Sequence, residues 1–362
     1  MSTSPANVIL VGCGCPLRGM GWYHAVQLLE GQCPSGKLVA IVEPWFLGAG
    51  AESEQGVIFN EWKEEMIKKH EGLGFYGSLG EVPKDSTPTL ALISGRTASN
   101  PGLLTECIAH GCSVVYLEKP GAPTVGELQA MKEEALANKV SVLMGYNKNV
   151  CKYVSNVRAF ASLNSGTVTF VSNNAYSNTA ASLGECFERN SEGMLKNMAI
   201  HELALLVSFY DVTVENIQEV VADKEFSSLQ TLTGPSGTSF TDFSKIKFNL
   251  KTKTGQSVNV QADRCGGSVS YATVTNEEGE EIFRYSMPDS DDLEDVKRLE
   301  KKYPGAMPYF FSQDPDYVTV KERVSKFCAK GEEAKGVATI EVAVETMRIA
   351  EYLEGVLKTQ LM

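Results

Sequence analysis

The sequence predicts an α/β protein with two domains. We expect an N-terminal Rossmann domain with a doubly wound parallel sheet and a C-terminal α+β domain with a large, mainly antiparallel open sheet. Continuous apolar strands alternate with helices in residues 1–147, which is typical of a parallel sheet covered on both faces. A glycine-rich turn follows the first of these strands. Residues 148–362 instead contain strand-like runs joined by hairpin turns.

The elements of the first domain are placed by their apolar runs and by the residues that end them. Val8-Ile9-Leu10-Val11 is a buried type of strand that stops at a glycine, and Gly111 ends a helix as a C-cap glycine does. The expected strands are 8–11, 38–42, 90–93, 114–117 and 140–144, and the expected helices are 22–29, 58–70, 103–110 and 125–137.

The second domain begins with a strand and continues into a strongly apolar helix over 193–209. Gly255 and the Glu278-Gly279 pair mark hairpin turns. The expected strands are 167–171, 217–221, 245–251, 257–262, 268–275 and 281–285. Residues 287–316, rich in charge and proline, are predicted as a long excursion, and two helices over 318–330 and 338–357 follow it.

Composition narrows the class of protein. The chain has 362 residues, 43% hydrophobic and 22% charged, as expected of a globular protein with a sizeable core. Its net charge of −12 argues against a nucleic acid or an anionic membrane as the main partner. No stretch approaches the roughly 20 apolar residues of a membrane span. The N-terminus has no basic region after Met1, so we expect no secretory signal and a cytoplasmic protein. The nine cysteines form no CxxC pairs, so we expect reduced thiols and no metal site.

The glycine-rich turn predicts a dinucleotide site. A Rossmann fingerprint needs G-x-G-x-x-G between the first strand and helix, so that the backbone can approach a pyrophosphate. Gly12 and Gly14 are present, but the third glycine is displaced by an insertion of about four residues, so Gly19 or Gly21 must take its place. Glycines at a sharp turn also serve structure alone, and the strand before and the helix after this turn favour the functional interpretation.

Glu43 is the predicted determinant of the cofactor. It ends the second strand, where an acidic side chain accepts hydrogen bonds from the adenosine ribose and repels a 2′-phosphate, which favours NAD over NADP. Arg18, inside the insertion, has three interpretations: a ligand of the pyrophosphate, a ligand of a 2′-phosphate, or a solvated side chain. NADP therefore stays an alternative. Trp45 either flanks the adenine or has only a structural role in packing.

Two further groups of residues carry chemistry. Glu118-Lys119-Pro120 follows an apolar strand, so Lys119 is expected at the carboxyl edge of the sheet, where open α/β sheets bind ligands. A lysine there can handle protons, although a solvated lysine in a turn is the simpler interpretation of the tripeptide alone. Asn197 and His201 are four residues apart on the helix predicted over 193–209. Either both are core residues, or Asn197 orients His201 for proton transfer.

Together these motifs resemble the glucose-fructose oxidoreductase/inositol dehydrogenase/rhizopine catabolism family of NAD(P)-dependent oxidoreductases. The resemblance is strongest over residues 90–149, which include the Glu-Lys-Pro tripeptide and Gly145-Tyr146-Asn147. It implies that Lys119 lies beside the nicotinamide and the substrate, with Glu118 and Pro120 at the cofactor, and that the Lys119-Pro120 bond is cis. The family's Asp-x-x-x-His element reads Asn197 to His201 here, so the carboxylate is replaced by an amide. The enlarged glycine loop and Gly95-Arg96 are further departures.

The resemblance implies hydride transfer between NAD(H) and a polar carbonyl or alcohol compound such as a sugar or polyol. Lys119 and His201 are the expected proton-handling residues, and Tyr146, Asn147 and Lys148 are candidates for substrate contact or for a structural hinge. We also expect a homodimer or homotetramer paired through the second-domain sheet. A non-catalytic, dinucleotide-responsive regulator is the alternative, and a reductase of unsaturated or tetrapyrrole-like substrates is a third possibility.

Overall fold

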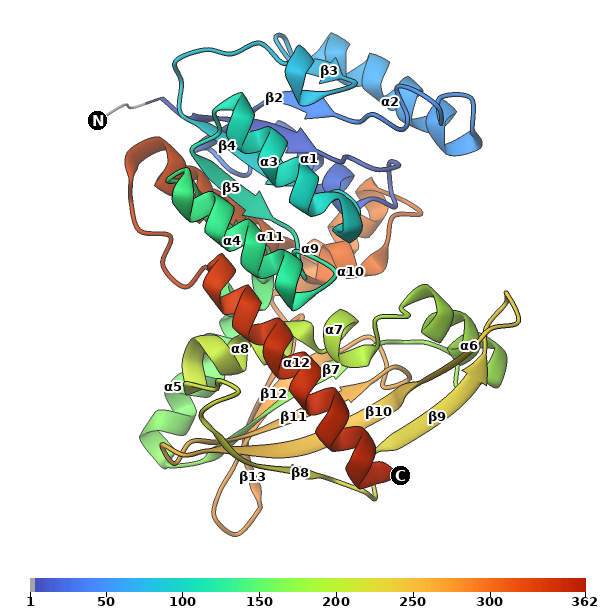
Figure 1. The fold of residues 1–362 in the computed structure, drawn as a ribbon, viewed down its shortest axis with the longest axis vertical. Coiled ribbons are helices and arrows are strands. Elements are labelled where there is room, and N and C mark those ends of the chain that lie inside the picture. The colour runs from blue at the N-terminus through green and yellow to red at the C-terminus, as the bar shows by residue number, and fades with distance from the viewer. Residues whose placement is uncertain (1–3) are drawn as a thin grey trace. The chain divides into compact units, whose positions relative to one another are not determined.

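The computed structural model describes residues 4–362, which divide into two compact units (Figure 1). Unit 1 comprises the chain up to Asn147 together with Asp292–Ala343, and unit 2 comprises Lys148–Asp291 together with Val344–Met362. The chain thus leaves unit 1 after Asn147, but, unlike in the two-segment division predicted above, a C-terminal segment returns to it. It returns because helix α11 (Asp314–Lys330) packs against β1, β2, β4 and β5 of unit 1.

Unit 1 is built on a six-stranded parallel sheet with strand order β3-β2-β1-β4-β5-β6. The order runs outward from β1 in both directions, so right-handed crossovers put the connecting helices on both faces. This is the doubly wound sheet that the sequence predicted. The strands are β1 (Ala6–Val11), β2 (Gly36–Val42), β3 (Gly74–Tyr76), β4 (Thr89–Ile93), β5 (Val114–Leu117) and β6 (Ser141–Met144).

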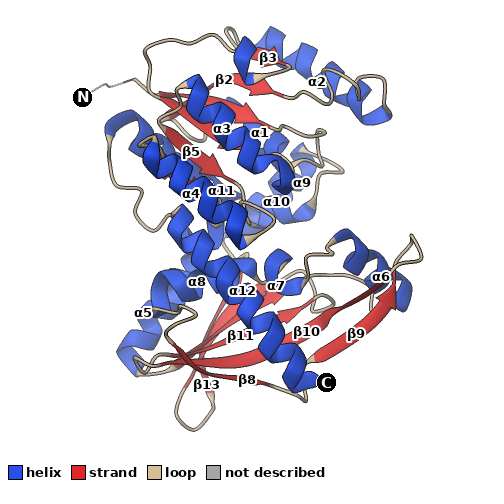
Figure 2. Cartoon of the chain, in the orientation of Figure 1, coloured by secondary structure: helices blue, strands red, loops and turns tan. Residues whose placement is uncertain are grey.

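Helices cover this sheet (Figure 2). Helices α3 and α4 pack against each other and on β4 and β6, whereas α1 packs on β1 and β2, the strands that also contact α11. The helices of unit 1 are α1 (Met20–Leu29), α2 (Glu54–Lys69), α3 (Asn100–His110), α4 (Val125–Ala137), α9 (Asp292–Lys302), α10 (Pro308–Ser312) and α11. The predicted excursion over 287–316 therefore contains two helices.

Unit 2 contains a seven-stranded sheet with the path β13-β12-β7-β11-β10-β8, and β9 pairs with β10. Every neighbouring pair is antiparallel except β7 and β11, which run parallel. The mainly antiparallel sheet predicted for this half is confirmed. Its strands are β7 (Thr167–Asn173), β8 (Ile217–Ala222), β9 (Ser228–Thr233), β10 (Ser239–Thr252), β11 (Ser257–Asp263), β12 (Ser270–Thr275) and β13 (Glu281–Met287).

The helices of unit 2 differ from the prediction at one important place. The single helix expected over 193–209 is two helices, α7 (Met194–Asn197) and α8 (Ile200–Tyr210). The break arises because the N–H groups of Met198 and Ala199 both donate to the Met194 carbonyl, so the regular hydrogen-bond ladder stops there. The other helices are α5 (Lys152–Asn164), α6 (Ala180–Arg189) and α12 (Ile340–Leu361), which starts in unit 1. Between residues 4 and 362, no helix combines the length and apolar character needed to cross a membrane.

Candidate active site

The glycine turn lies between β1 and α1. Gly12 and Gly14 have φ angles of +83° and +73°, a region that glycine adopts without strain. A Cβ on Gly21 would lie 2.1 Å from the carbonyl oxygen of Gly12, so helix α1 can pack this closely on the turn only with glycine there. A Cβ on Gly19 would lie 2.7 Å from the Cys13 carbonyl oxygen. Both displaced glycines are therefore needed by the backbone.

The first turn of α1 has the properties of an anion site. Within the described chain, the N–H groups of Met20, Gly21 and Trp22 have no hydrogen-bond acceptor, and no acidic residue lies in that turn. Unpaired N–H groups at a helix N-terminus bind phosphate oxygens readily. The turn and this helix end therefore fit the pyrophosphate of a dinucleotide.

Glu43 contacts the glycine turn directly. It follows β2, its side chain is buried, and its Oε2 accepts a hydrogen bond from the N–H of Gly14 at 2.8 Å. The carboxylate thus supports the turn from the β2 side and brings a negative charge to it. Arg18 is exposed, and Trp45 is 55% exposed with its indole packed over Gly50.

Lys119 lies just beyond the end of β5, at the carboxyl edge of the sheet. Its side chain is partly buried, and the Lys119-Pro120 peptide bond is cis, as the resemblance implied. The N–H of Glu118 donates to the carbonyl of Ile93, so the strand pairing continues up to the residue before the lysine. The backbone of Lys119 is therefore held close to the sheet.

Glu118 belongs to a buried polar network under the tripeptide. Its Oε1 lies 2.9 Å from His24 Nε2 and accepts a hydrogen bond from the Tyr116 hydroxyl, also at 2.9 Å. Gly145 borders this network, because a Cβ there would lie 2.7 Å from Glu118 Oε1. The glycine after β6 thus makes room for the carboxylate that precedes Lys119.

The network continues into the C-terminal segment of unit 1. Lys321 on α11 donates to His24 Nδ1 at 3.0 Å, to the Tyr317 carbonyl at 2.9 Å and to the side chain of Gln27. Gln27 in turn donates to Asp314 Oδ1 at 2.6 Å. Helices α1 and α11 are thus joined by polar contacts to the strand end that carries Lys119.

Burial and charge set the protonation states in this network. Burial and the charge of Lys321 lower the pKa of His24 to about 4, so the ring is neutral at pH 7, donating to Glu118 from Nε2 and accepting at Nδ1. Burial lowers the pKa of Lys321 to about 8. Burial would raise the pKa of Glu118, but the contacts with His24 and Tyr116 and the charge of Lys119 outweigh it and lower that pKa. Glu118 is therefore a buried anion beside Lys119.

The segment after β6 is buried. Tyr146 and Asn147 are almost fully enclosed, and the amide of Asn147 donates to Gln313 Oε1 at 2.9 Å within unit 1. Burial raises the pKa of the Tyr146 hydroxyl. Lys148, the first residue of unit 2, forms a buried ion pair with Glu202 on α8 and lies 3.4 Å from Ser172 Oγ. The charge of Lys148 is thus already matched by a carboxylate of its own unit.

Asn197 and His201 lie on either side of the break between α7 and α8. The side-chain amide of Asn197 donates to Glu192 Oε1 at 2.8 Å, and both Asn197 and His201 are partly buried. The sequence predicted that Asn197 and His201 lie on one continuous helix. The structure instead places them on two helices. The buried Glu202 follows His201 directly.

Sequence reasoning missed His24, Lys321 and Glu202. All three are buried and titratable. His24 and Glu202 lie on helices that are largely apolar, which was the available signal. Their partners come from distant parts of the chain, so the pairing itself left no local pattern.

The first domain matches a known family. Residues 7–146 match the family described as "Oxidoreductase family, NAD-binding Rossmann fold", which is the glucose-fructose oxidoreductase/inositol dehydrogenase/rhizopine catabolism family. The match covers the first domain of the chain up to Tyr146. The family predicted from the Glu-Lys-Pro and Gly-Tyr-Asn motifs is confirmed, and it is a family of NAD-binding oxidoreductases.

Solved structures extend the likeness over nearly the whole chain. A myo-inositol dehydrogenase from Corynebacterium glutamicum is 17% identical with a TM-score of 0.65, covering 96% of this chain and 95% of that one. A myo-inositol 2-dehydrogenase from Lactobacillus plantarum is 15% identical with a TM-score of 0.68, covering 97% of both.

A scyllo-inositol dehydrogenase from Lactobacillus casei, solved with NAD(H) and scyllo-inositol, is 12% identical with a TM-score of 0.66, covering 97% of this chain and 96% of that one. At these identities the likeness shows the shared two-part fold. No curated protein sequence matches the chain.

Proposed function

We propose that this protein is an NAD(H)-dependent oxidoreductase that acts on a sugar, a polyol or a related polar carbonyl or alcohol. The observation that carries the proposal is Lys119, held at the carboxyl edge of a Rossmann sheet beside the buried carboxylate of Glu118. The family match of residues 7–146 and the inositol dehydrogenases of similar fold support this class of reaction.

The residues of the glycine turn fit a dinucleotide. The glycines of the turn, Gly12, Gly14, Gly19 and Gly21, would let the backbone approach the pyrophosphate closely. The unpaired N–H groups at the start of α1 and the side chain of Arg18 would bind its oxygens, and Glu43 would face the adenosine ribose. The negative charge of Glu43 at the turn favours NAD over NADP, because a 2′-phosphate would meet a carboxylate. When bound, the nicotinamide supplies or accepts the hydride.

The protein's own groups handle the proton. In the proposed mechanism, Lys119 donates a hydrogen bond to the reacting oxygen, and His201 exchanges the proton with it. The carboxylate of Glu118 balances the charge of Lys119. Asn197 orients His201 through its amide, while Tyr146 and Asn147 shape the site from the segment that leaves unit 1. Lys148 is the weakest of the proposed substrate contacts, since its charge is paired with Glu202.

The proposal is tested by turnover with NADH or NAD over a panel of sugars, inositols and inosose-type ketones. Lys119→Ala and His201→Ala should each lower kcat/KM by about 10²–10⁴ while NADH still binds, because each removes a proton-handling group and leaves the Rossmann site intact. NADH should bind more tightly than NADPH in direct titrations. Tight NADH binding without turnover on any of these compounds would instead support a dinucleotide-responsive regulator.

A further inference from the structure

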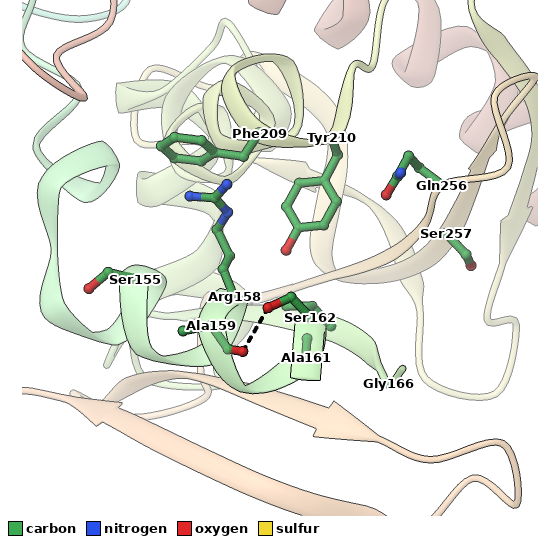
Figure 3. A pocket seen from close by; sticks show the side chains of 11 residues that line it. Ser155, Arg158, Ala159, Ala161, Ser162, Gly166, Phe209, Tyr210, Gln256 and Ser257 are labelled. Carbon is green, nitrogen blue, oxygen red and sulfur yellow. Dashed lines mark hydrogen bonds between the residues drawn. The ribbon is translucent and has the colours of Figure 1, made fainter. Parts of the chain in front are cut away.

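Unit 2 contains a pocket of about 480 Å³ that includes none of the residues proposed for catalysis. It is formed by α5, the start of β7, the end of α8 and the turn that leads into β11 (Figure 3). Its volume lies in the range of small-molecule sites. None of the residues that line it is acidic.

Arg158 on α5 supplies the charge of this pocket. Its guanidinium carbon lies 3.8 Å from the centroid of the Phe209 ring. Over residues 4–362, Arg158 has neither an ion pair nor a hydrogen bond. The other arginines of unit 2 all pair with carboxylates, although the chain has 45 acidic residues for 33 basic ones. These pairs are Arg189 with Glu185, Arg264 with Asp242, Arg284 with Glu281, and Arg348 with Glu215 and Glu345.

Two neutral groups complete a set of donors. The side chains of Tyr210 and Gln256 line the pocket, and neither makes a hydrogen bond to the described residues. Burial raises the pKa of Tyr210 to about 12, against the opposing charge of Arg158, so its hydroxyl keeps the proton at neutral pH. By contrast, the hydroxyls of Ser155 and Ser162 already donate to carbonyls of their own helix.

We propose that this pocket binds a small organic monocarboxylate. The guanidinium carbon lies over the Phe209 ring, and the guanidinium N–H groups, which have no acceptor among residues 4–362, can donate the two parallel hydrogen bonds that a carboxylate accepts. Tyr210 and Gln256 offer further donors, and the aromatic side chain of Phe209 suits an apolar ligand body. Within the described chain, Arg158 is the single charged side chain that lines the pocket. Its one positive charge matches the single negative charge of a monocarboxylate better than the two negative charges of a phosphate.

Benzoate is a suitable probe, and its site is located by the Nε–Hε NMR signal of Arg158, assigned by its absence in Arg158→Met. Benzoate should shift this signal saturably, whereas chloride at the same ionic strength should not. Calorimetry should show that Arg158→Met weakens benzoate binding by about tenfold or more, as expected for a lost bidentate, charge-assisted pair. NADH affinity should be unchanged in this variant, which controls for its folding.

Arg284→Met is the matched control. Arg284 also stacks on an aromatic ring, at 4.3 Å from the Tyr271 centroid, but its N–H groups are taken by Glu281. This variant should bind benzoate like the unmodified protein. The proposal is overturned if benzoate gives no saturable shift of the Arg158 signal, or if uncharged benzyl alcohol binds equally well. Tighter binding of inorganic phosphate than of benzoate would overturn the assignment to a carboxylate.

Discussion

At the scale of single residues, the site depends on space as much as on charge. The carboxylate of Glu118 fits beside Lys119 only because residue 145 has no side chain. This gives a physical reason for the glycine of the Gly-Tyr-Asn motif, which sequence comparison alone does not supply. The same carboxylate connects the strand end to His24, so a small change at Gly145 should reach the network as a whole.

Gly145→Ala is therefore expected to destabilise the protein by about 1–3 kcal/mol, the usual cost of forcing a methyl group into a packed site. The new Cβ would lie 2.7 Å from Glu118 Oε1 and 2.8 Å from the Tyr116 hydroxyl. Urea denaturation measures the change. Gly126→Ala in α4 is the control, since its Cβ would meet nothing within 4 Å and alanine favours a helix. Equal stability of the two variants would contradict this account of Gly145.

His24 should make stability depend on pH. Burial lowers its pKa to about 4 in the folded protein, so below about pH 6.5 the unfolded chain binds the proton first. The free energy of unfolding should then fall as the pH falls from 6.5 to 5, by at most about 2 kcal/mol from this group. The other titratable groups that face it lie outside this window, since Lys321 titrates near 8 and the pKa of Glu118 is lowered.

Urea denaturation at several pH values tests this prediction. His24→Gln, whose side chain can still donate to Glu118, should remove most of the dependence on pH between 6.5 and 5. A slope that is the same in the variant would assign the effect to other groups.

At the scale of elements, the ion pair of Lys148 and Glu202 joins the segment after β6 to α8. Lys148→Met should cost about 3–5 kcal/mol of stability, because it leaves a buried carboxylate without its counter-charge. Lys148→Met with Glu202→Leu should recover much of that loss. Lys152→Met is the control, since that lysine is 52% exposed and exposed ion pairs contribute little.

These stabilities are measured by chemical denaturation, together with kcat and KM. A variant Lys148→Met that keeps its stability but loses substrate affinity would instead favour the substrate contact predicted from the sequence.

Elements also show where sequence reasoning succeeds. The strand over 114–117 and the helix over 125–137 have the predicted bounds, because a run of apolar residues and a Thr124 N-cap mark them locally. The break at Met198 and Ala199 left no such mark, since neither proline nor glycine lies between the two helices. Helices α5 and α6 were missed although a local pattern was present. Each buries one apolar face, formed by Tyr153, Val154 and Val157 in α5 and by Leu183, Cys186 and Phe187 in α6.

At the scale of the whole molecule, the connectivity of the chain was the part least visible in the sequence. The parallel and antiparallel sheets follow from local patterns, whereas the return of Asp292–Ala343 to unit 1 depends on a surface that β1, β2, β4 and β5 present together. Pairing of two copies through the sheet of unit 2, as a homodimer or homotetramer, stays a prediction.

That return makes the Rossmann unit discontinuous, and truncation tests it. A fragment that ends at Asn147 lacks α11, so the sheet face under Val320 and Val324 becomes exposed. His24 and Gln27 also lose Lys321, which leaves buried polar groups unsatisfied. We expect this fragment to bind the dye ANS, to unfold without a cooperative transition and to fail to bind NADH.

Joining the fragment to Asp292–Ala343 through a flexible glycine-serine linker should restore all three properties, because it returns α11 and Lys321 to their places. Lys321→Met in the joined protein should keep helix α11 but lose the polar contacts with His24 and Gln27. Comparing the joined protein with this variant therefore separates the contribution of helix packing from that of the polar contacts. If the fragment ending at Asn147 unfolds cooperatively and binds NADH, the C-terminal segment is not needed for the folding or the binding function of the Rossmann domain.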